Sequence, residues 1–477
     1  MTSSPRSEGS AAATPTLHPG DVVEIDCSDL IAKTGQAVGR FGGMAVFVWG
    51  PIAGERAWVR IESVKPRYAV ADLVELVTRA PERAEPFCPV FGACGGCQVQ
   101  HVAYDAQLRW KRSLVESALT RIGKLQNVRV GATVAMANPR NYRNKMALVV
   151  DGAQQPLSFG FYAARTHEVV PLEGCPIVMP QLDAYIRGLN DAARDPESAP
   201  AFDGAKHVIA RTAAATGEAV VSVTTDRASP VLAQAAEAVA KHLPGVVGIA
   251  NSFEPPSDNA VMGRRSATAF GRVDIDETIA GIRFRVSPAS FFQVNGEMVA
   301  AIFGSMEKLL AAAGPKKVLD LYCGAGTFSL FFARGGAEVA GVEENPNAVR
   351  EARANAAING LEARTSFFSG RVDSVLRTPK GKTLLEGAEV VFLDPPRKGS
   401  DEITLATLNR TRVPRIWYLS CNPATLARDA AQLAAGGYVL EGVQPFDMFP
   451  QTGHVEALAV FRRSDVPPLL FPALEGD

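Results

Sequence analysis

The sequence has no long apolar run. Although 47% of its 477 residues are hydrophobic, no uninterrupted apolar stretch approaches the ~18 residues that a membrane-spanning helix needs. Residues 1–17 are rich in Ser, Ala, Pro and Thr and have neither a basic start nor an apolar segment. They are therefore predicted to be a disordered tail and not a signal peptide. We expect a cytoplasmic protein with no membrane partner.

The chain also has almost no net charge. Its formal charge is −1 at pH 7, so binding to nucleic acid would have to come from a local basic face and not from the whole protein. Internal repeats are absent as well, which excludes a solenoid. With 477 residues the chain is too long for one ordinary core, and two or three domains are expected.

Paired cysteines are also missing. There are seven cysteines, an odd number, which in a cytosolic chain is evidence against a disulfide framework. Metal ligands, a reactive thiol or core residues are the alternatives, and each cysteine has to be placed individually.

Short apolar runs separated by Gly and Pro fill residues 18–79. This pattern predicts a small β-barrel of about five strands. Barrels of this size often bind single-stranded nucleic acid. An oligonucleotide-binding module is therefore one reading of this segment.

A likely amphipathic helix follows a Pro-rich break, in "YDAQLRWKRSLVESALTRIG". Its basic side chains could face phosphates, but most charge runs are solvated helix faces, which is the reading we favour on the sequence alone. The residues in question are Arg109, Lys111, Arg112 and Arg121.

The remaining chain divides into two patterns. Residues 80–290 alternate apolar strands such as "KMALVV" and "EAVVSVTT" with Ala-rich helical pieces, which predicts an α+β middle domain. From residue 291 to residue 477 the strings "KVLDLYCGAG", "AEVAGVEEN", "EVVFLDPPR" and "RIWYLSCNP" form a βα series. Such a series predicts a doubly wound parallel sheet with ligands at the carboxyl ends of its strands.

Three cysteines lie close together in "CPVFGACGGC", and a fourth lies in a distant "GCP". The four are Cys88, Cys94, Cys97 and Cys175. Zinc sites more often use two Cys-x2-Cys knuckles, whereas iron–sulfur clusters tolerate a three-plus-one arrangement. We therefore favour a cluster, with zinc or unliganded thiols as alternatives.

A cofactor loop is predicted in "VLDLYCGAGTFSL". Glu343 ends the next strand, the position at which a carboxylate binds ribose hydroxyls, and the turn contains Gly324. The third glycine of the dinucleotide fingerprint is missing, with Phe328 in that region, so S-adenosylmethionine, which has no phosphate, fits better than NAD. Asp394 in "VVFLDPPRKG" ends a further strand and is either a ligand contact or part of a simple turn.

Cys421 lies between an apolar strand and a predicted helix in "YLSCNPATLARD". Asn422 is a good N-cap and Pro423 suits the first helical position. A helix N-terminus favours the thiolate, so we expect a lowered thiol pKa, whereas burial would raise it. Glu456, which opens a final apolar strand after "GHV", is a candidate partner base or an ordinary surface carboxylate.

Taken together, these strings resemble the RNA uracil-5 methyltransferase family, S-adenosylmethionine enzymes that make 5-methyluridine in RNA. The matching strings are "SFFQVN", "LDLYCGAGTFSL", "DPPRKG", "LSCNP" and "FPQTGHVEALAVF", in this order. "GQAVGRFGGMAVFVWGPIAGERAWVRI" in the barrel is similar to a TRAM domain, and the cysteine pattern is similar to the family's 4Fe-4S site. The resemblance also implies that part of residues 98–130 packs with the catalytic domain.

The resemblance assigns roles by position. Cys421 matches the nucleophile and Glu456 the base. The positions that match the cofactor site are Gln293, Tyr322, Gly324, Thr327, Glu343 and Asp394. Gln293 is also expected to reach the uracil, and Thr327 stands where several members have Asn. The residue that meets the adenine, among Gly370, Arg371 and Asp373, is left unassigned.

The expected substrate is a uridine in RNA, with 23S ribosomal RNA favoured and the T-loop uridine of transfer RNA as an alternative. Arg143 and Lys145 in "NYRNK" are candidates for contacts with the RNA backbone. A cytosine-5 methyltransferase and a non-catalytic RNA-binding scaffold are the rival hypotheses.

Overall fold

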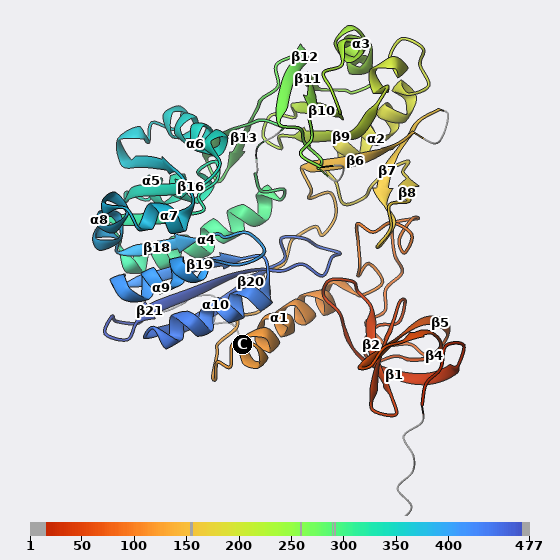
Figure 1. Cartoon of the computed structure of the whole chain (residues 1–477), viewed down its shortest axis with the longest axis horizontal. Helices are drawn as coiled ribbons and strands as arrows, with labels where there is room; N and C mark the ends of the chain where they lie inside the picture. Colours follow the sequence, from red (N-terminus) through yellow and green to blue (C-terminus); the bar gives the residue numbers. More distant parts are fainter. Residues whose placement is uncertain (1–15, 153–155, 258–259, 289, 291, 470–477) are drawn as a thin grey trace, which may run out of the picture. The chain divides into compact units, whose positions relative to one another are not determined.

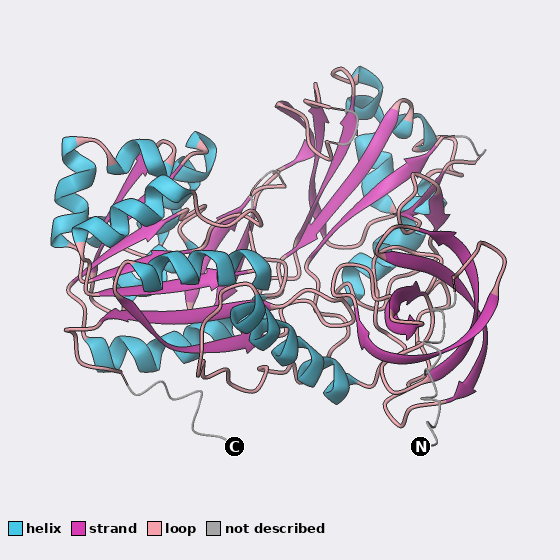
Figure 2. Cartoon of the chain, turned by 60° about the horizontal axis from the view of Figure 1, so that its bottom comes forward, coloured by secondary structure: helices cyan, strands magenta, loops and turns pink. Residues whose placement is uncertain are grey.

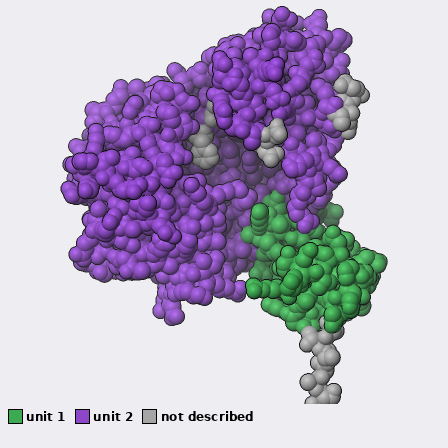
Figure 3. Space-filling model, in the orientation of Figure 1, with its two compact units in different colours: residues 1–86, 98–103 green, residues 87–97, 104–477 purple. Residues whose placement is uncertain are grey.

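The computed structural model describes residues 16–152, 156–257, 260–288, 290 and 292–469. The chain divides into two compact units, residues 1–86 with 98–103 and residues 87–97 with 104–477 (Figure 3). The short cysteine-bearing segment 87–97 thus belongs to the second unit. No helix within the described ranges is long and apolar enough to cross a membrane.

The first unit is a closed five-stranded barrel, as predicted, with strand order β1-β2-β3-β5-β4. Alternate residues of β4, such as Ala57, Val59 and Ile61, face its core. The buried Glu55 accepts two hydrogen bonds of 2.6 Å from Arg83 beside the barrel. The strands are β1 (Val22–Leu30), β2 (Ala37–Phe41), β3 (Met44–Val48), β4 (Arg56–Val64) and β5 (Tyr68–Thr78).

The second unit contains a mixed seven-stranded sheet of order β12-β11-β10-β9-β6-β7-β8. Only β10 and β11 pair in parallel; the other neighbours are antiparallel. Its strands are β6 (Lys145–Asp151), β7 (Ser158–Tyr162), β8 (Val169–Pro171), β9 (Ala205–Thr212), β10 (Ala219–Thr225), β11 (Val246–Phe253) and β12 (Arg265–Gly271). Its helices are α2 (Pro180–Ala192), η1 (Ala199–Phe202) and α3 (Pro230–Lys241). We call it the middle sheet.

A second seven-stranded sheet follows, of order β17-β16-β15-β18-β19-β21-β20 (Figures 1 and 2). The first five strands are parallel, whereas β21 runs antiparallel to both β19 and β20. Its strands are β15 (Lys317–Leu321), β16 (Glu338–Glu343), β17 (Thr365–Ser369), β18 (Val390–Leu393), β19 (Arg415–Ser420), β20 (Tyr438–Phe446) and β21 (Glu456–Arg463). We call it the catalytic sheet.

Helices cover both faces of the catalytic sheet, as a doubly wound fold requires. Trp417 and Leu419 of β19 point into a core shared with α4, α5 and α6, while Ile416 and Tyr418 point into the opposite core, shared with α1, α9 and α10. The helices are α1 (Tyr104–Arg121), α4 (Gly296–Ala313), α5 (Thr327–Arg334), α6 (Pro346–Ile358), η2 (Glu362–Arg364), α7 (Val372–Leu376), α8 (Pro379–Gly387), α9 (Glu402–Thr411) and α10 (Pro423–Ala435). A hairpin, β13 (Ile275–Ile279) and β14 (Ile282–Val286), precedes α4.

Candidate active site

The polar residues predicted for the site meet at one edge of the catalytic sheet. Tyr322, Asp394 and Cys421 each follow directly on the last residue of a parallel strand, and Glu343 is the last residue of β16. Glu456 is the first residue of β21, which runs the other way, so it starts at this same edge. The topology therefore gathers side chains from five strands.

Cys421 and Glu456 face each other across two neighbouring strands. In the β19–β21 pairing Ser420 lies opposite Ala457, so the next position outward places Cys421 opposite Glu456. The two groups are close enough for the carboxylate to raise the thiol pKa. Strand register therefore decides that these two positions lie opposite each other.

The helix after Cys421 begins as predicted. Asn422 is the N-cap of α10, and its side chain accepts a hydrogen bond of 3.1 Å from the backbone N–H of Ala424. Pro423 is the first helical residue, and α10 ends at Ala435 before two glycines. The Asn422 side-chain amide also donates to the carbonyl of Arg397, at 3.0 Å.

The prediction of a lowered thiol pKa was wrong for this structure. The pKa of Cys421 is raised from 9.0 to about 11, first by burial and then by the negative charges of Glu456 and Asp394. Arg397 acts in the opposite direction but is the weaker influence. Burial is the largest cause of the rise, and the carboxyl groups at the ends of neighbouring strands add to it.

The pKa values of two carboxyl groups beside the thiol are also raised. Burial raises the pKa of Asp394 to about 7. Burial, with Asp394 as the next cause, also raises the pKa of Glu456 well above its usual value, and Arg397 lowers it. Glu456 is 3% exposed, and its Oε1 atom has no hydrogen-bond partner among the described residues.

Arg397 is the cation of this cluster, and the sequence reasoning did not assign it a role, although it lies in the "DPPRKG" string. The loop that carries it is fastened to α10. Its carbonyl accepts from Asn422 and from Thr425, and the Ser400 backbone N–H donates to Asp429 at 2.9 Å. The loop position of Arg397 is thereby linked to the helix that begins beside Cys421.

The cofactor turn has the predicted strand–turn–helix form. Glu343 accepts hydrogen bonds from the backbone N–H groups of Gly324, at 3.2 Å, and of Asn345, at 2.7 Å. Tyr322 has a positive φ of 67°, and its hydroxyl lies 3.1 Å from Ser400 Oγ. Burial raises the Tyr322 pKa to about 12.

The helix after the turn is anchored by aromatic packing. Thr327 is the first residue of α5 and is buried. Phe328 is buried against Phe303 and Phe392. Phe328, in the region of the missing fingerprint glycine, is therefore a core residue. Asp320, which no sequence motif had singled out, lies buried behind the turn with a pKa raised to about 8 by burial.

Gln293 lies in the loop between β14 and α4. Its carbonyl accepts from the side chain of Asn144 at 3.4 Å. Asn295, two positions further on, caps α4 and donates to the carbonyl of Met448 at 3.0 Å. The Gln293 loop is thus joined to the segment that leads to Glu456.

The adenine-contacting position stays unassigned. Gly370 has a φ of 154°, and its N–H donates to the Glu343 carbonyl at 2.9 Å. Asp373 is already engaged by Arg371 at 3.1 Å and Arg377 at 3.2 Å.

The four predicted ligand cysteines lie near one another around β7 and α2. Cys88 and Cys94 both raise the pKa of Cys175, and Cys97 and Cys175 both act on the hydroxyl of Tyr142. All seven cysteines of the chain are described, and none forms a disulfide. As the side chains stand, no group of three or more His, Cys, Asp or Glu in the described ranges is arranged to hold a metal ion.

One basic residue of α1 fits neither of the two predictions made from the sequence, contact with phosphates or a solvated helix face. Lys111 is fully buried and pairs with Asp447, so it neither faces phosphates nor belongs to a solvated face. Arg112 pairs with Glu116 at 2.9 Å along the helix, and Arg121 is exposed. Lys145 of β6 donates to the carbonyl of Pro288 at 3.4 Å, and burial lowers its pKa to about 8.

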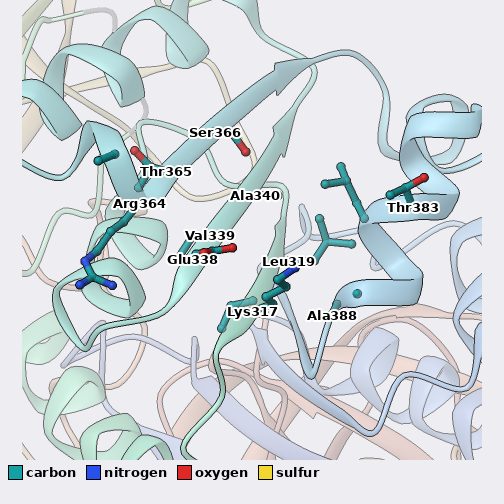
Figure 4. A pocket seen from close by; sticks show the side chains of 14 residues that line it. Lys317, Leu319, Glu338, Val339, Ala340, Arg364, Thr365, Ser366, Thr383 and Ala388 are labelled. Atoms are coloured by element: carbon teal, nitrogen blue, oxygen red, sulfur yellow. The ribbon is translucent and has the colours of Figure 1, made fainter.

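A cavity of about 280 Å³ lies at the opposite edge of the catalytic sheet, where its strands begin (Figure 4). Lys317, Glu338 and Thr365 line it, and each is the first residue of its strand. It holds none of the groups with perturbed pKa values described above. A second cavity of about 310 Å³ is lined by residues that include Tyr142, Asn144 and Asn295, beside the Gln293 loop.

Comparisons with known proteins agree with this geometry. The tRNA (Uracil-5-)-methyltransferase family model matches residues 272–464, and the TRAM domain model matches residues 17–74. The chain is 38% identical over 451 residues to an uncharacterised RNA methyltransferase of Halalkalibacterium halodurans, covering 93% of this chain and 97% of the relative. A similar protein of Listeria monocytogenes is 36% identical over 93% of this chain and 98% of its own length.

One solved structure is similar over most of the chain. It is the Pyrococcus abyssi tRNA (uracil-54, C5)-methyltransferase in complex with S-adenosyl-L-homocysteine, with a TM-score of 0.70 and 25% identity, covering 92% of this chain and all of that one. The barrel, the catalytic sheet and the relatives agree, and the chain belongs to the RNA uracil-5 methyltransferase family, whose members use S-adenosylmethionine.

Proposed function

We propose that this enzyme methylates C5 of a uridine in RNA through a covalent adduct of Cys421, with Glu456 as the base. One observation carries the proposal: the register of β19 and β21 sets Cys421 opposite Glu456 at the edge where β15, β16 and β18 also end. A nucleophile and a general base must both reach one ring, and this arrangement presents both to the same space.

S-adenosylmethionine supplies the methyl group as a sulfonium cation. The residues that would hold it are those around the turn after β15: Gln293, Tyr322, Gly324, Thr327, Glu343 and Asp394. A Cβ at Gly324 would meet no other atom within 4 Å, so the turn faces open space. Together with an acidic strand end at Glu343, this fits a ligand with a ribose and a positive charge.

Cys421 starts the reaction by adding its sulfur to C6 of the uracil, which moves the C5–C6 electron pair into the ring as an enolate. C5 would then take the methyl group that S-adenosylmethionine, bound at the residues named above, would supply from its sulfonium. Glu456 next removes the remaining proton from C5. The electron pair re-forms the C5–C6 double bond, and the thiolate of Cys421 leaves.

The raised pKa values are those expected of a site that binds a cation. Burial raises the pKa values of Cys421, Asp394 and Glu456. The negative charges of Glu456 and Asp394 add to the rise for Cys421, and that of Asp394 adds to the rise for Glu456. A sulfonium placed beside them would lower all three, because it stabilises each ionised form. Thiolate formation would therefore be favoured in the loaded enzyme.

The mechanism is tested with RNA that carries 5-fluorouridine, whose fluorine Glu456 cannot remove. The wild type with S-adenosylmethionine is expected to form a stable protein–RNA complex on a denaturing gel, and Cys421→Ala is expected to form none. Cys27→Ser is the matched control, because Cys27 is a buried cysteine of the barrel core and not part of the catalytic sheet, and it should form the complex as the wild type does. An adduct that persists in Cys421→Ala would contradict the assignment.

For the substrate we favour 23S ribosomal RNA, since the chain combines a TRAM-type barrel with the cysteine pattern. The T-loop uridine of transfer RNA is a second candidate, and the likeness to the Pyrococcus abyssi tRNA enzyme favours it. In either case the target base must leave its stack to reach Cys421, and the barrel would hold flanking nucleotides.

Nucleoside mapping separates the two substrates. We expect cells without the gene to lose 5-methyluridine from a defined position of 23S ribosomal RNA and to regain it on complementation. Loss of 5-methyluridine from transfer RNA alone would favour the T-loop uridine as the substrate. Transfer to cytidine instead of uridine would favour the cytosine-5 alternative, and no transfer to any RNA would favour a binding scaffold.

We further propose that Cys88, Cys94, Cys97 and Cys175 hold a 4Fe-4S cluster with a structural role. The donor set fits such a group because backbone N–H groups point at the sulfurs. Gly96 donates to Cys94 Sγ at 3.4 Å, and Ile177 and Val178 lower the pKa of Cys175 in the same way. Hydrogen bonds to sulfur are typical of cluster ligands.

Iron and sulfide analysis after anaerobic purification tests the cluster. The wild type and Cys27→Ser, in which a cysteine of the barrel core is changed, should contain iron, and Cys94→Ser should have lost it. Zinc without iron in the wild type would favour the zinc alternative.

A further inference from the structure

Helix α1 buries polar side chains where an amphipathic helix should bury apolar ones. Its buried residues follow one stripe, Gln107, Lys111, Val115 and Leu119. Val115 and Leu119 pack into the core shared with α10 and β20. Lys111 lies one turn before Val115 and is 0% exposed, and Gln107 lies two turns before it and is 1% exposed. Half of the buried stripe is therefore made of groups that are costly to desolvate.

Both polar side chains bind the segment that joins β20 to β21. Lys111 Nζ forms an ion pair with the Asp447 carboxylate and donates to the carbonyl of Phe449 at 3.0 Å. Gln107 Nε2 donates to Gln451 Oε1 at 3.0 Å, and Gln107 Oε1 accepts from the Gln451 backbone N–H at 3.1 Å. We call these four residues, Gln107, Lys111, Asp447 and Gln451, the α1 tether.

The segment between Asp447 and Gln451 is also held from other directions. The Tyr142 hydroxyl donates to the carbonyl of Pro450 at 3.1 Å. Asn295, in the loop that carries Gln293, donates to the carbonyl of Met448 at 3.0 Å. The backbone N–H of Asp447 donates to Val134 at 3.0 Å. Glu456 follows a few residues later, so its carboxylate depends on how firmly this segment is fixed.

A buried ion pair is a poor way to gain stability. The desolvation of both charges offsets most of their attraction, and well-packed apolar residues often replace such a pair without loss of stability. What the pair does provide is one defined geometry, because any other loop arrangement leaves two charges buried and unpaired. Its place, between a rigid helix and the segment before the base, points to a role in the reaction.

We propose that the α1 tether positions Glu456 for the removal of the C5 proton. This inference rests on the proposed role of Glu456. The four residues are positioning residues, since none of them touches the reacting atoms. Helix α1 also packs against α10, where Gly123 lies so close that a Cβ there would be 2.9 Å from the carbonyl of Ala427. The same helix thus supports the element after the nucleophile and the segment before the base.

The proposal predicts which step fails when the tether is lost. Cys421 and the cofactor residues are untouched, so RNA binding, S-adenosylmethionine binding and methyl transfer should proceed. Proton removal should slow by roughly 10- to 100-fold, the scale of a displaced catalytic group. The methylated RNA should then remain attached to Cys421.

The test uses the full chain with ordinary uridine RNA. The double variant Lys111→Met with Asp447→Asn removes both charges and nearly keeps the volume of each side chain, so that no buried charge is left unpaired. Gln107→Ala is a milder variant that removes only the neutral part of the tether. Both should accumulate a covalent protein–RNA complex that carries labelled methyl, with unchanged KM for RNA and lower kcat.

Val115→Ala is the matched control. It opens a cavity on the same stripe of α1 without touching the tether, so it should lower the melting temperature without accumulating the complex. Equal accumulation in Val115→Ala, or wild-type kinetics in both tether variants, would overturn the proposal. If the wild type fails to form an adduct even with 5-fluorouridine RNA, the proposed function fails and the positioning role with it.

Discussion

The second unit contains two seven-stranded sheets, and one buried polar residue of each, Asn251 and Glu456, makes a contrast. In the middle sheet Asn251 donates to the carbonyl of Val223 at 3.1 Å and to Thr225 Oγ1 at 2.9 Å, and accepts from the backbone N–H of Ser229 at 2.8 Å. In the catalytic sheet Glu456 is equally buried, but its Oε1 has no partner in the described part of the chain.

Strand direction explains the difference. The middle sheet is mostly antiparallel, so the ends of successive strands lie at opposite edges. In the catalytic sheet five parallel strands end at one edge, and β21 begins there. Side chains at strand ends are therefore brought together at one edge of the catalytic sheet, whereas those of the middle sheet are divided between its two edges. Satisfied polar groups stabilise a fold, whereas gathered and unsatisfied ones mark a site.

The sharpest way to separate the two sheets is to remove one buried polar group from each. Glu456→Gln should lower the rate of proton removal, and so of the release of methylated RNA, by ~10²- to 10⁴-fold, the usual contribution of a general base, with little change in stability. Asn251→Ala should leave the release rate per folded molecule unchanged and cost about 1–3 kcal/mol, because it orphans buried hydrogen-bonding groups. Single-turnover release of methylated RNA and urea unfolding measure the two effects.

In Glu456→Gln the methylated RNA should stay bound to Cys421, since the proton at C5 remains. A variant that turns over at the wild-type rate would show that another group takes this proton. An equal rate loss in Asn251→Ala would remove the distinction between the sheets.

A smaller effect is expected when one glycine next to each sheet is replaced by alanine. Gly326, before α5, has a φ of 87°, and a Cβ there would lie 3.2 Å from the Cβ of Ala352. Gly217, between β9 and β10, has a φ of 69° and open space around it. Both Ala substitutions should cost about 1–2 kcal/mol of backbone strain. Only Gly326→Ala should also weaken S-adenosylmethionine binding, because it displaces the cofactor turn.

Calorimetric titration with S-adenosylmethionine, beside thermal unfolding, measures both outcomes. Weaker S-adenosylmethionine binding in Gly217→Ala would mean that a change beside the middle sheet also alters the cofactor turn, and the two sheets would then not differ in this respect.

The smallest expected effect is a shift in the titration of Cys421. Its pKa of about 11 predicts that alkylation by iodoacetamide in the absence of substrates rises steeply only at high pH. Glu456 is a negative neighbour that disfavours the thiolate, so Glu456→Gln should move the midpoint to lower pH. S-adenosylmethionine should move it in the same direction through its positive charge.

The Cys421→Ser variant gives the background from other cysteines in this experiment. A wild-type midpoint below the ordinary 9.0 would restore the helix N-terminus as the stronger influence.

Local features of the site could be predicted from the sequence because their causes are local. The cap formed by Asn422 and Pro423 requires only adjacent residues, and α10 begins there. The βα series and the barrel follow from hydrophobic periodicity, and both are present. The cofactor turn with Glu343 needed only the spacing of two strands.

Other features depend on residues far apart in the chain. Lys111 lies in a helix rich in positive charge, and only the fold reveals that it pairs with Asp447, 336 positions away. The thiol pKa of Cys421 is raised first by burial and then by Glu456 and Asp394 at the ends of neighbouring strands, and the local string reveals none of these causes. Sequence patterns thus predicted the positions of these side chains better than their electrostatic environment.

The antiparallel insertion of β21 has a consequence for how the enzyme can vary. Because Ser420 pairs with Ala457, hydrogen bonding between strands sets the separation of the nucleophile and the base at about 5 Å between backbones. The intervening α10 and β20 do not set it. Related enzymes could therefore lengthen or shorten α10 and the turn that follows it, and so adapt to differently shaped RNA, while the chemistry at the sheet edge stays the same.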